Sequence, residues 1–209
     1  RAAENLLCAL KAGYDPLKVV VDRAHEKGVR VMASLRINEG SPPTGQNLYM
    51  VGKLKYEKPE VMIGEADTDN SGAAGAYDFA RPEVRQERLA VIEEVCDRYE
   101  ADGLEIDDYV RVFFKREEVQ TNTSLLTDFV REVRELLGRI GKKRDQQLYL
   151  AARVHPVEAA NLDIGMDVRT WLAEKLVNLV IPSSGGAESS FVDSNPIAQW
   201  LIESAHAAG

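Results

Sequence analysis

Four short strand-like segments alternate with amphipathic helical segments, and this order restricts the fold more than any other feature of the chain. The predicted strands cover residues 29–38, 103–107, 148–154 and 177–181. The predicted helices, which have apolar residues at helical spacing, cover residues 15–28, 82–99, 123–140, 168–176 and 196–205. Such an alternation predicts an α/β fold with a mostly parallel sheet covered by helices.

Two architectures share this alternation, a doubly wound open sheet and a (β/α)₈ TIM barrel. No glycine-rich phosphate-binding turn follows any predicted strand, and polar residues gather at the carboxyl ends of the strands, where barrel enzymes keep their sites. Both observations favour the barrel. Only about four βα units are visible in residues 1–209, whereas a complete barrel needs about 250 residues. We therefore expect a single, partial TIM-barrel domain.

The ends of several helices carry recognisable signals. Asp15 and Pro16 have the residue types of a helix cap and a first helical position, and Gly28 has that of a C-terminal cap. Asp167 is expected to cap the helix that starts at residue 168, and Ser194 or Asn195 to cap the last helix, which starts at Pro196. Gly141 is expected to stop the helix before it.

Residues 39–75 form a predicted long loop, with a short helix near residues 49–55. A loop of this length in a compact domain is usually functional. Aromatic residues in this and neighbouring loops can stack on sugars or pack beneath the loops, namely Tyr49, Tyr77, Phe113 and Phe114.

Composition excludes some classes of partner. The formal charge is −8, with acidic and basic residues mixed along the chain, which argues against nucleic acid. No apolar run has the roughly 20 residues of a membrane helix. Cys8 and Cys96 show no zinc-ligand spacing, and no cofactor or metal site is predicted. The chain begins with Arg1 and shows no signal peptide, so we expect its N-terminus to be missing and predict no compartment. No sequence feature predicts an oligomeric state.

The acidic end of the strand at residues 103–107 is the main candidate for chemistry. Because side chains alternate across a sheet, Leu104 and Ile106 should face the helices while Glu105 and Asp107 face the barrel interior. A carboxylate in a water-poor interior must be paired or have a shifted pKa, as catalytic acids and bases do. Asp107, Asp108 and Glu105 are therefore the candidate catalytic residues. Glu105 could instead form a structural ion pair, and Asp108 could cap the next loop.

Six residues at neighbouring strand ends are candidates for substrate binding. Arg36 and Arg153 could orient a carboxylate or bind an anionic group. His155, just beyond a strand end, could donate to a hydroxyl, act as acid or base, or ligate a metal. Asp78 could cap the helix that begins at Pro82 or face the interior. The set comprises Arg36, Asn38, Asp78, Tyr109, Arg153 and His155.

Two stretches resemble a bacterial glycosyl-hydrolase-like family of TIM-barrel proteins. The stretches are YDPLKVVVDRAHEKGVRVMASLRIN and AYDFARPEVRQERLAVIEEVCDRYEADGLEIDDY, and the likeness extends over roughly residues 14–182. The resemblance implies that this chain holds strands three to six of the barrel and that Asp107 belongs to a sugar site. The chain departs from many relatives at Ser34-Leu35-Arg36, where they have aromatic residues, and an arginine there could suit a charged sugar.

Three functions fit these observations. In glycoside hydrolysis, two carboxylates lie about 5–5.5 Å apart for retention or about 6.5–9.5 Å apart for inversion. Asp107 is the candidate for one, and the other could be Glu39, Asp78, Asp108 or a residue outside the chain. The alternatives are a non-catalytic carbohydrate-binding barrel and a metal-dependent enzyme using Asp107, Asp108 and His155. The expected partner in the first two is a carbohydrate.

Overall fold

The computed structural model describes residues 2–45, 51–64, 74–107, 112–183 and 198–209. Its centre is a parallel sheet in the order β1-β2-β3-β4, so each strand lies beside the strand that precedes it in the chain. The strands are β1 (Met32–Arg36), β2 (Gly103–Asp107), β3 (Tyr149–Val154) and β4 (Leu179–Pro182). A doubly wound sheet reverses its strand order, and this sheet does not. The fold is the α/β fold of a partial TIM barrel, as predicted.

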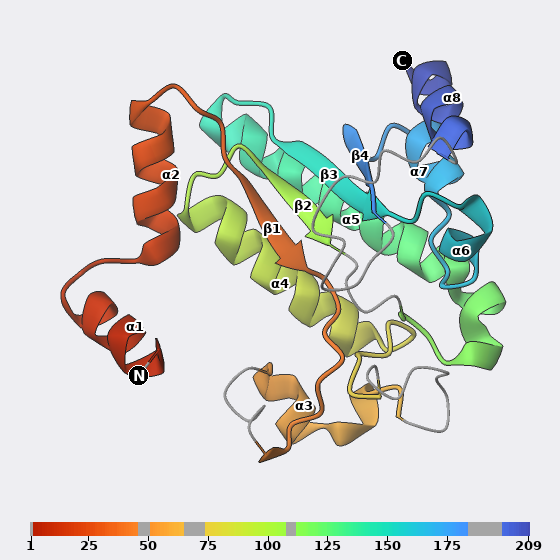
Figure 1. Cartoon of the computed structure of the whole chain (residues 1–209), viewed down its shortest axis with the longest axis horizontal. Helices are drawn as coiled ribbons and strands as arrows, with labels where there is room; N and C mark the ends of the chain where they lie inside the picture. Colours follow the sequence, from red (N-terminus) through yellow and green to blue (C-terminus); the bar gives the residue numbers. More distant parts are fainter. Residues whose placement is uncertain (1, 46–50, 65–73, 108–111, 184–197) are drawn as a thin grey trace.

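Two long helices cover one face of the sheet. They are α4 (Pro82–Arg98) and α5 (Val119–Arg144), which lie side by side against β2 and β3 (Figure 1). The remaining helical segments are α1 (Ala2–Lys11), α2 (Pro16–Glu26), α3 (Lys53–Glu57), η2 (Pro59–Val61), η5 (Arg116–Glu118), α6 (Glu158–Leu162), α7 (Val168–Ala173) and α8 (Gln199–Ala208).

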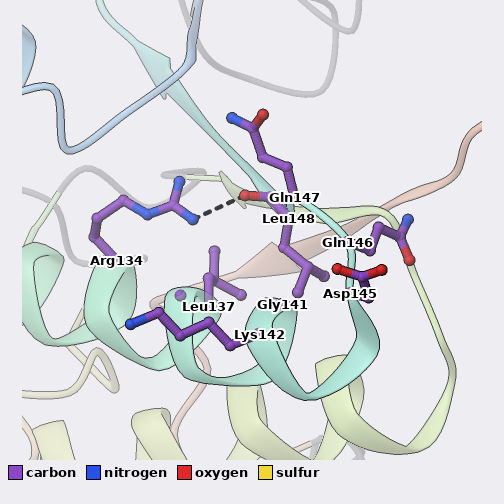
Figure 2. Close-up of a pocket in the computed structure, with 9 residues that line it drawn as sticks. Arg134, Leu137, Gly141, Lys142, Asp145, Gln146, Gln147 and Leu148 are labelled. Carbon is purple, nitrogen blue, oxygen red and sulfur yellow. Dashed lines mark hydrogen bonds between the residues drawn. The ribbon is translucent and has the colours of Figure 1, made fainter.

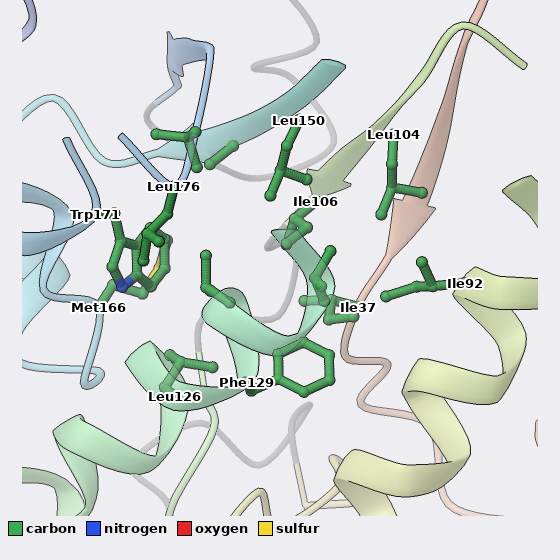
Figure 3. Close-up of a cluster of buried hydrophobic side chains, with 14 of the residues drawn as sticks. Ile37, Ile92, Leu104, Ile106, Leu126, Phe129, Leu150, Met166, Trp171 and Leu176 are labelled. Atoms are coloured by element: carbon green, nitrogen blue, oxygen red, sulfur yellow. The ribbon is translucent and has the colours of Figure 1, made fainter. Parts of the chain in front are cut away.

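The hydrophobic core lies between the sheet and these two helices (Figure 3). Leu104 and Ile106 of β2 and Leu150 of β3 point into it and are buried. Phe79, which precedes α4, makes edge-to-face ring contacts with Phe113 at 5.1 Å and with Phe129 at 5.4 Å. This alternation confirms that the odd-numbered side chains of β2, Glu105 and Asp107, belong to the opposite face of the sheet.

Most predicted helix signals are confirmed. Asp15 accepts a hydrogen bond from the Leu17 N–H at 3.2 Å, and Asp167 accepts one from the Thr170 N–H at 3.1 Å. Gly28 has a left-handed φ of 69° just after α2. The possible caps of the last helix, Ser194 and Asn195, lie outside the described residues.

The prediction that Gly141 stops its helix is wrong. α5 continues to Arg144 and ends at Asp145, which adopts a left-handed φ of 50°. Gly141 is buried within the last turn, and a Cβ atom there would collide with the carbonyl oxygen of Gln146. The glycine is thus required by close packing of the chain that returns toward β3, and not by a break in the helix.

Both edge strands of the sheet have one side without a strand partner among the described residues. β1 pairs with β2, and β4 pairs with β3. Exposed apolar side chains lie on the two helices before β1, namely Leu6, Leu7 and Leu10 of α1 and Val19 and Val20 of α2. Proteins normally cover the unpaired edges of a sheet. Four described strands with two unpaired edges match an arc of a barrel and not a closed barrel.

A buried carboxylate joins three segments at the amino-terminal end of the sheet. Asp102 accepts hydrogen bonds from the Val31 N–H at 2.7 Å and from the Gln146 side chain at 2.7 Å, and its Oδ2 lies 2.9 Å from Nε2 of His25. Burial acts to raise the pKa of Asp102, but the hydrogen bonds from Val31, His25 and Gln146 together outweigh it, and the pKa lies below its usual value. His25 therefore links α2 to the base of the sheet.

We expect Asp102→Asn to lower the free energy of unfolding at pH 7 by about 1–3 kcal/mol, because a charged hydrogen-bond acceptor is lost. The pKa of Asp102 is lower in the folded than in the unfolded chain. Its contribution is therefore complete above about pH 4 and is lost as the pH falls through the folded-state pKa. Urea unfolding from pH 3 to pH 7 should show the two proteins converging at low pH. The exposed Asp163→Asn is the control, and a constant difference at every pH would contradict the expectation.

Candidate functional site

The face of the sheet opposite the core carries a small cluster of charged side chains. Arg36 comes from β1, Glu105 and Asp107 from β2, and Arg153 from β3, all at or near the carboxyl ends of their strands. The parallel register pairs Arg36 with Asp107, which places their backbones side by side. The sheet thus brings together four of the residues that the sequence singles out.

Arg153 is the centre of this cluster. One of its terminal nitrogens donates to Oε1 of Glu105 at 2.5 Å, and its Nε lies 3.4 Å from Oδ1 of Asp107. The three side chains are only 13–25% exposed. Glu105 therefore forms the ion pair that the structural interpretation of this residue predicts. Arg153 contacts both carboxylates.

The two carboxylates of β2 have unequal environments. Glu105 accepts a hydrogen bond from Arg153 at 2.5 Å, whereas the Asp107 carboxylate lies 3.4 Å from Nε of Arg153. Burial raises the pKa of Asp107, Arg153 and Arg36 act against this increase, and the negative charge of Glu105 adds to it. The net result is a carboxyl group whose pKa lies above its usual value, at the strand end where barrel enzymes place their chemistry.

The other predicted residues at this rim have mainly local contacts. Asp78 is buried, accepts a hydrogen bond from the Ala80 N–H at 2.9 Å and lies 3.5 Å from Arg81. The prediction that it caps the helix is wrong, because Arg81 occupies the cap position of α4 and Asp78 binds the turn before it. Nδ1 of His155 accepts a hydrogen bond from the Val157 N–H at 3.0 Å. A neutral ring with that bond carries its proton on Nε2. Asp108 and Tyr109 lie outside the described residues, as does Tyr49.

Asn38 is fully enclosed, and its amide is bonded to backbone groups. Its Nδ2 donates to the carbonyls of Tyr77 at 2.9 Å and Val112 at 2.7 Å, and its Oδ1 accepts from the N–H groups of Tyr77 at 2.8 Å and Glu39 at 2.9 Å. These contacts describe a residue that joins chain segments at the rim. They leave no donor or acceptor position of the amide for a sugar.

A buried lysine that sequence reasoning missed lies beside Glu39. The Lys55 side chain is 0% exposed, and its ammonium group donates to the Glu39 carbonyl at 2.7 Å, to Oε2 of Glu39 at 3.0 Å and to the Ser41 carbonyl at 3.1 Å. Burial acts to raise the pKa of Glu39, but hydrogen bonds from Ser41 and Lys55 together keep it below its usual value. No local signal marks Lys55, since Lys53 on the same short helix is 84% exposed.

The aromatic candidates are packing residues. Tyr77, Phe113 and Phe114 are all at most 2% exposed. Two cations lie near the Tyr77 ring, with Lys55 Nζ 4.7 Å and the Arg88 guanidinium 5.0 Å from its centre. All three rings are enclosed, so they present no face for stacking on a sugar.

A surface groove of about 360 Å³ lies at the other end of the sheet, between the end of α5 and the start of β3 (Figure 2). Arg134 lines it and donates to the Leu148 carbonyl at 2.8 Å. None of the predicted site residues lines this groove. The amino-terminal end of a barrel usually serves stability, so we assign the groove no catalytic role.

Two features bear on the alternative functions. Within residues 2–45, 51–64, 74–107, 112–183 and 198–209, no three His, Cys, Asp or Glu side chains come together in a way that could hold a metal ion. Asp108, one member of the metal-ligand hypothesis, lies outside these ranges.

The helices in the same ranges are too short or too polar to cross a membrane.

Comparison with known proteins supports the resemblance found in the sequence. The chain is 32% identical over 101 residues to the glycosyl hydrolase DigH of Escherichia coli K12, an alignment that covers 46% of this chain and 23% of DigH. The DigH protein of Shigella flexneri matches to the same extent. The chain thus spans about a quarter of the length of the curated relatives it matches.

Two solved structures superimpose on part of this chain at low sequence identity. An Anoxybacillus alpha-amylase superimposes with a TM-score of 0.48 at 16% identity, over 79% of this chain and 32% of the amylase chain. A cyclomaltodextrinase gives 0.44 at 15% identity, over 76% and 29% of the two chains. The family described as Glycosyl hydrolase-like 10 matches residues 8–126, which is more than half of the chain. This chain therefore belongs to the glycosyl hydrolase-like 10 family.

Proposed function

We propose that the protein hydrolyses glycosidic bonds of an oligosaccharide or polysaccharide and that Asp107 is a catalytic carboxyl group of this reaction. The observation that carries the proposal is the placement of Asp107 at the carboxyl end of β2, on the face of the sheet opposite α4 and α5, with its pKa raised by burial. Membership of a glycosyl-hydrolase-like family supports the same reaction.

The raised pKa suits a general acid. Glycosidases protonate the oxygen of the leaving sugar with a carboxylic acid, and a group that keeps its proton closer to neutral pH performs this step better. The partner carboxylate must be ionised. Glu39, whose pKa is held low, has the required ionisation state, and Asp108 is the chain neighbour of Asp107.

Arg153 acts as a positioning residue in this proposal. Its guanidinium group holds Glu105 and Asp107 at a fixed separation and limits how far the pKa of Asp107 rises. Arg36 and His155 are the proposed contacts to the substrate, since they lie at the neighbouring strand ends. An arginine among these contacts is compatible with a sugar that carries a negative charge.

A panel of glycans incubated with the full-length protein tests the function. We expect hydrolysis of at least one glycan and a decrease in kcat of at least about a hundredfold for Asp107→Asn, because a positioned acid or base contributes that much or more. Asp163→Asn, a change at an exposed residue, should keep full activity. Glycan binding without turnover by the unmodified protein would instead favour the carbohydrate-binding alternative.

The role of Arg153 predicts a change in the pH profile. Arg153→Met removes the cation that lowers the pKa of Asp107 the most, so this pKa should rise further above its usual value. A general acid with a higher pKa stays protonated to higher pH, and the alkaline limb of kcat/KM should shift in that direction. Arg36→Met should shift the limb less. Carbon-13 NMR titration of Asp107 measures the pKa directly, and an unchanged or lowered value in Arg153→Met would contradict the assignment.

A further inference from the structure

Side chains bind three consecutive carbonyl groups of the chain that follows β3. The carbonyls of His155 and Val157 accept hydrogen bonds from Nδ2 of Asn161, on α6, at 2.8 and 3.3 Å. The Pro156 carbonyl between them accepts one from Nε1 of Trp200, on α8, at 2.6 Å. These three residues form the segment through which the chain leaves β3, which we call the exit segment. Two different helices therefore fix its backbone.

Asn161 is the main anchor of the exit segment. The residue is only 1% exposed, and its Oδ1 accepts a hydrogen bond from the His155 N–H at 2.8 Å. The Asn161 carbonyl accepts one from the Met166 N–H at 2.8 Å, which fixes Asn161 in its turn. Asn161 thus binds both backbone groups of His155, as a neighbouring strand would, and both polar atoms of its own buried amide are paired.

The exit segment also determines which nitrogen of the His155 ring carries the proton. The Val157 N–H lies 3.0 Å from Nδ1, and the Val157 carbonyl lies 3.4 Å from the same nitrogen. A backbone N–H can only donate, so the shorter contact requires a lone pair on Nδ1 and places the proton of the uncharged ring on Nε2. The opposite tautomer would direct Nδ1–H at the Val157 carbonyl, to which Asn161 already donates.

This tautomer favours one of the three roles that the sequence allows for His155. A histidine that binds a metal through Nε2 needs its lone pair there and usually donates Nδ1–H to an oxygen. A general base also needs a lone pair on the nitrogen that takes the proton. In His155 the lone pair is on Nδ1, where the Val157 N–H uses it, and Nε2–H can only donate a hydrogen bond.

We infer that His155 donates a hydrogen bond through Nε2–H to an oxygen of the sugar, and that Asn161 is the positioning residue that fixes this tautomer. The identity of the acceptor rests on the proposed function, because His155 directly follows β3 at the end of the sheet where Asp107 lies. The tautomer does not rest on it, since every contact that fixes the tautomer lies within residues 155–161.

The tautomer is measured by long-range proton–nitrogen NMR of the full-length protein labelled with nitrogen-15 histidine, at about pH 8, above the usual titration range of histidine. The signals of His155 are those that His155→Gln lacks. We expect a protonated Nε2 and an unprotonated Nδ1. In Asn161→Ala the Val157 carbonyl loses its side-chain donor, so both tautomers should be populated and the two nitrogen signals should move toward each other.

A protonated Nδ1 in the unmodified protein would overturn the inference, and so would an unchanged tautomer in Asn161→Ala. If Asn161→Ala does not fold, Asn161→Leu fills the space without a donor or an acceptor and serves for the same measurement. Asn38→Ala is the matched control, since Asn38 is an equally buried asparagine that binds the backbone of Tyr77 and Val112 instead. An equal change of the His155 signals in this control would contradict the role of Asn161.

Turnover of a hydrolysed glycan tests the contact with the sugar. Loss of one neutral hydrogen bond in His155→Ala should raise KM about three- to tenfold with a smaller change in kcat. His155→Gln, whose amide supplies another N–H donor, should recover part of this loss. A decrease in kcat of about a hundredfold or more in His155→Ala would instead indicate an acid or base and overturn the inference.

The two proposals can fail separately. The expected tautomer in a protein that cleaves no glycan would remove the proposed function and leave the role of Asn161 intact. Cleavage of a glycan by a protein with the opposite tautomer would keep the function and remove the role of Asn161.

Discussion

The guanidinium group of Arg153 is the interaction on which the polar face of the sheet depends. Glu105 and Asp107 are two residues apart on one strand, so they point to the same side and share a poorly hydrated surface. One cation cannot serve both equally. Glu105 takes the close contact at 2.5 Å, and Asp107 keeps the longer one at 3.4 Å. Unequal sharing of one positive charge thus gives the two carboxylates different electrostatic environments.

The rim above the sheet is built from polar side chains that bind the backbone. Asn38 and Lys55 are both fully buried, and each satisfies several carbonyl groups that no helix or strand pairs. Buried carbonyls must find donors somewhere, and in the segment after β1 these two residues supply them. Hydrogen bonds from a few polar side chains therefore stabilise the rim, whereas many apolar contacts stabilise the core.

Local patterns in the sequence predict the four strands of the sheet and its main helices. The alternation in Gly103–Asp107 predicts both the bounds of β2 and the two faces of the strand. Successive side chains of a strand point to opposite faces, so the apolar residues face the helices and the acidic residues face away from them. Helix α1, helix α6 and the last turn of α5 were missed, the last because Gly141 serves close packing there. The contacts of Asn38 and Lys55 join residues 14 to 74 positions apart, and no local pattern encodes such distances. Side-chain alternation along the strands predicts that the charged residues share one face of the sheet. It does not predict which ion pairs form, since Glu105 could have paired with either Arg36 or Arg153.

The enclosure of Lys55 has a practical chemical consequence. An ammonium group with no exposed surface and three oxygen partners is shielded from acylating reagents, whereas its neighbour Lys53, 84% exposed, is open to them. The two lysines share a five-residue helix, so one peptide in a mass spectrum reports both. The ratio of their labelling rates therefore measures how often Lys55 separates from its oxygen partners on Glu39 and Ser41.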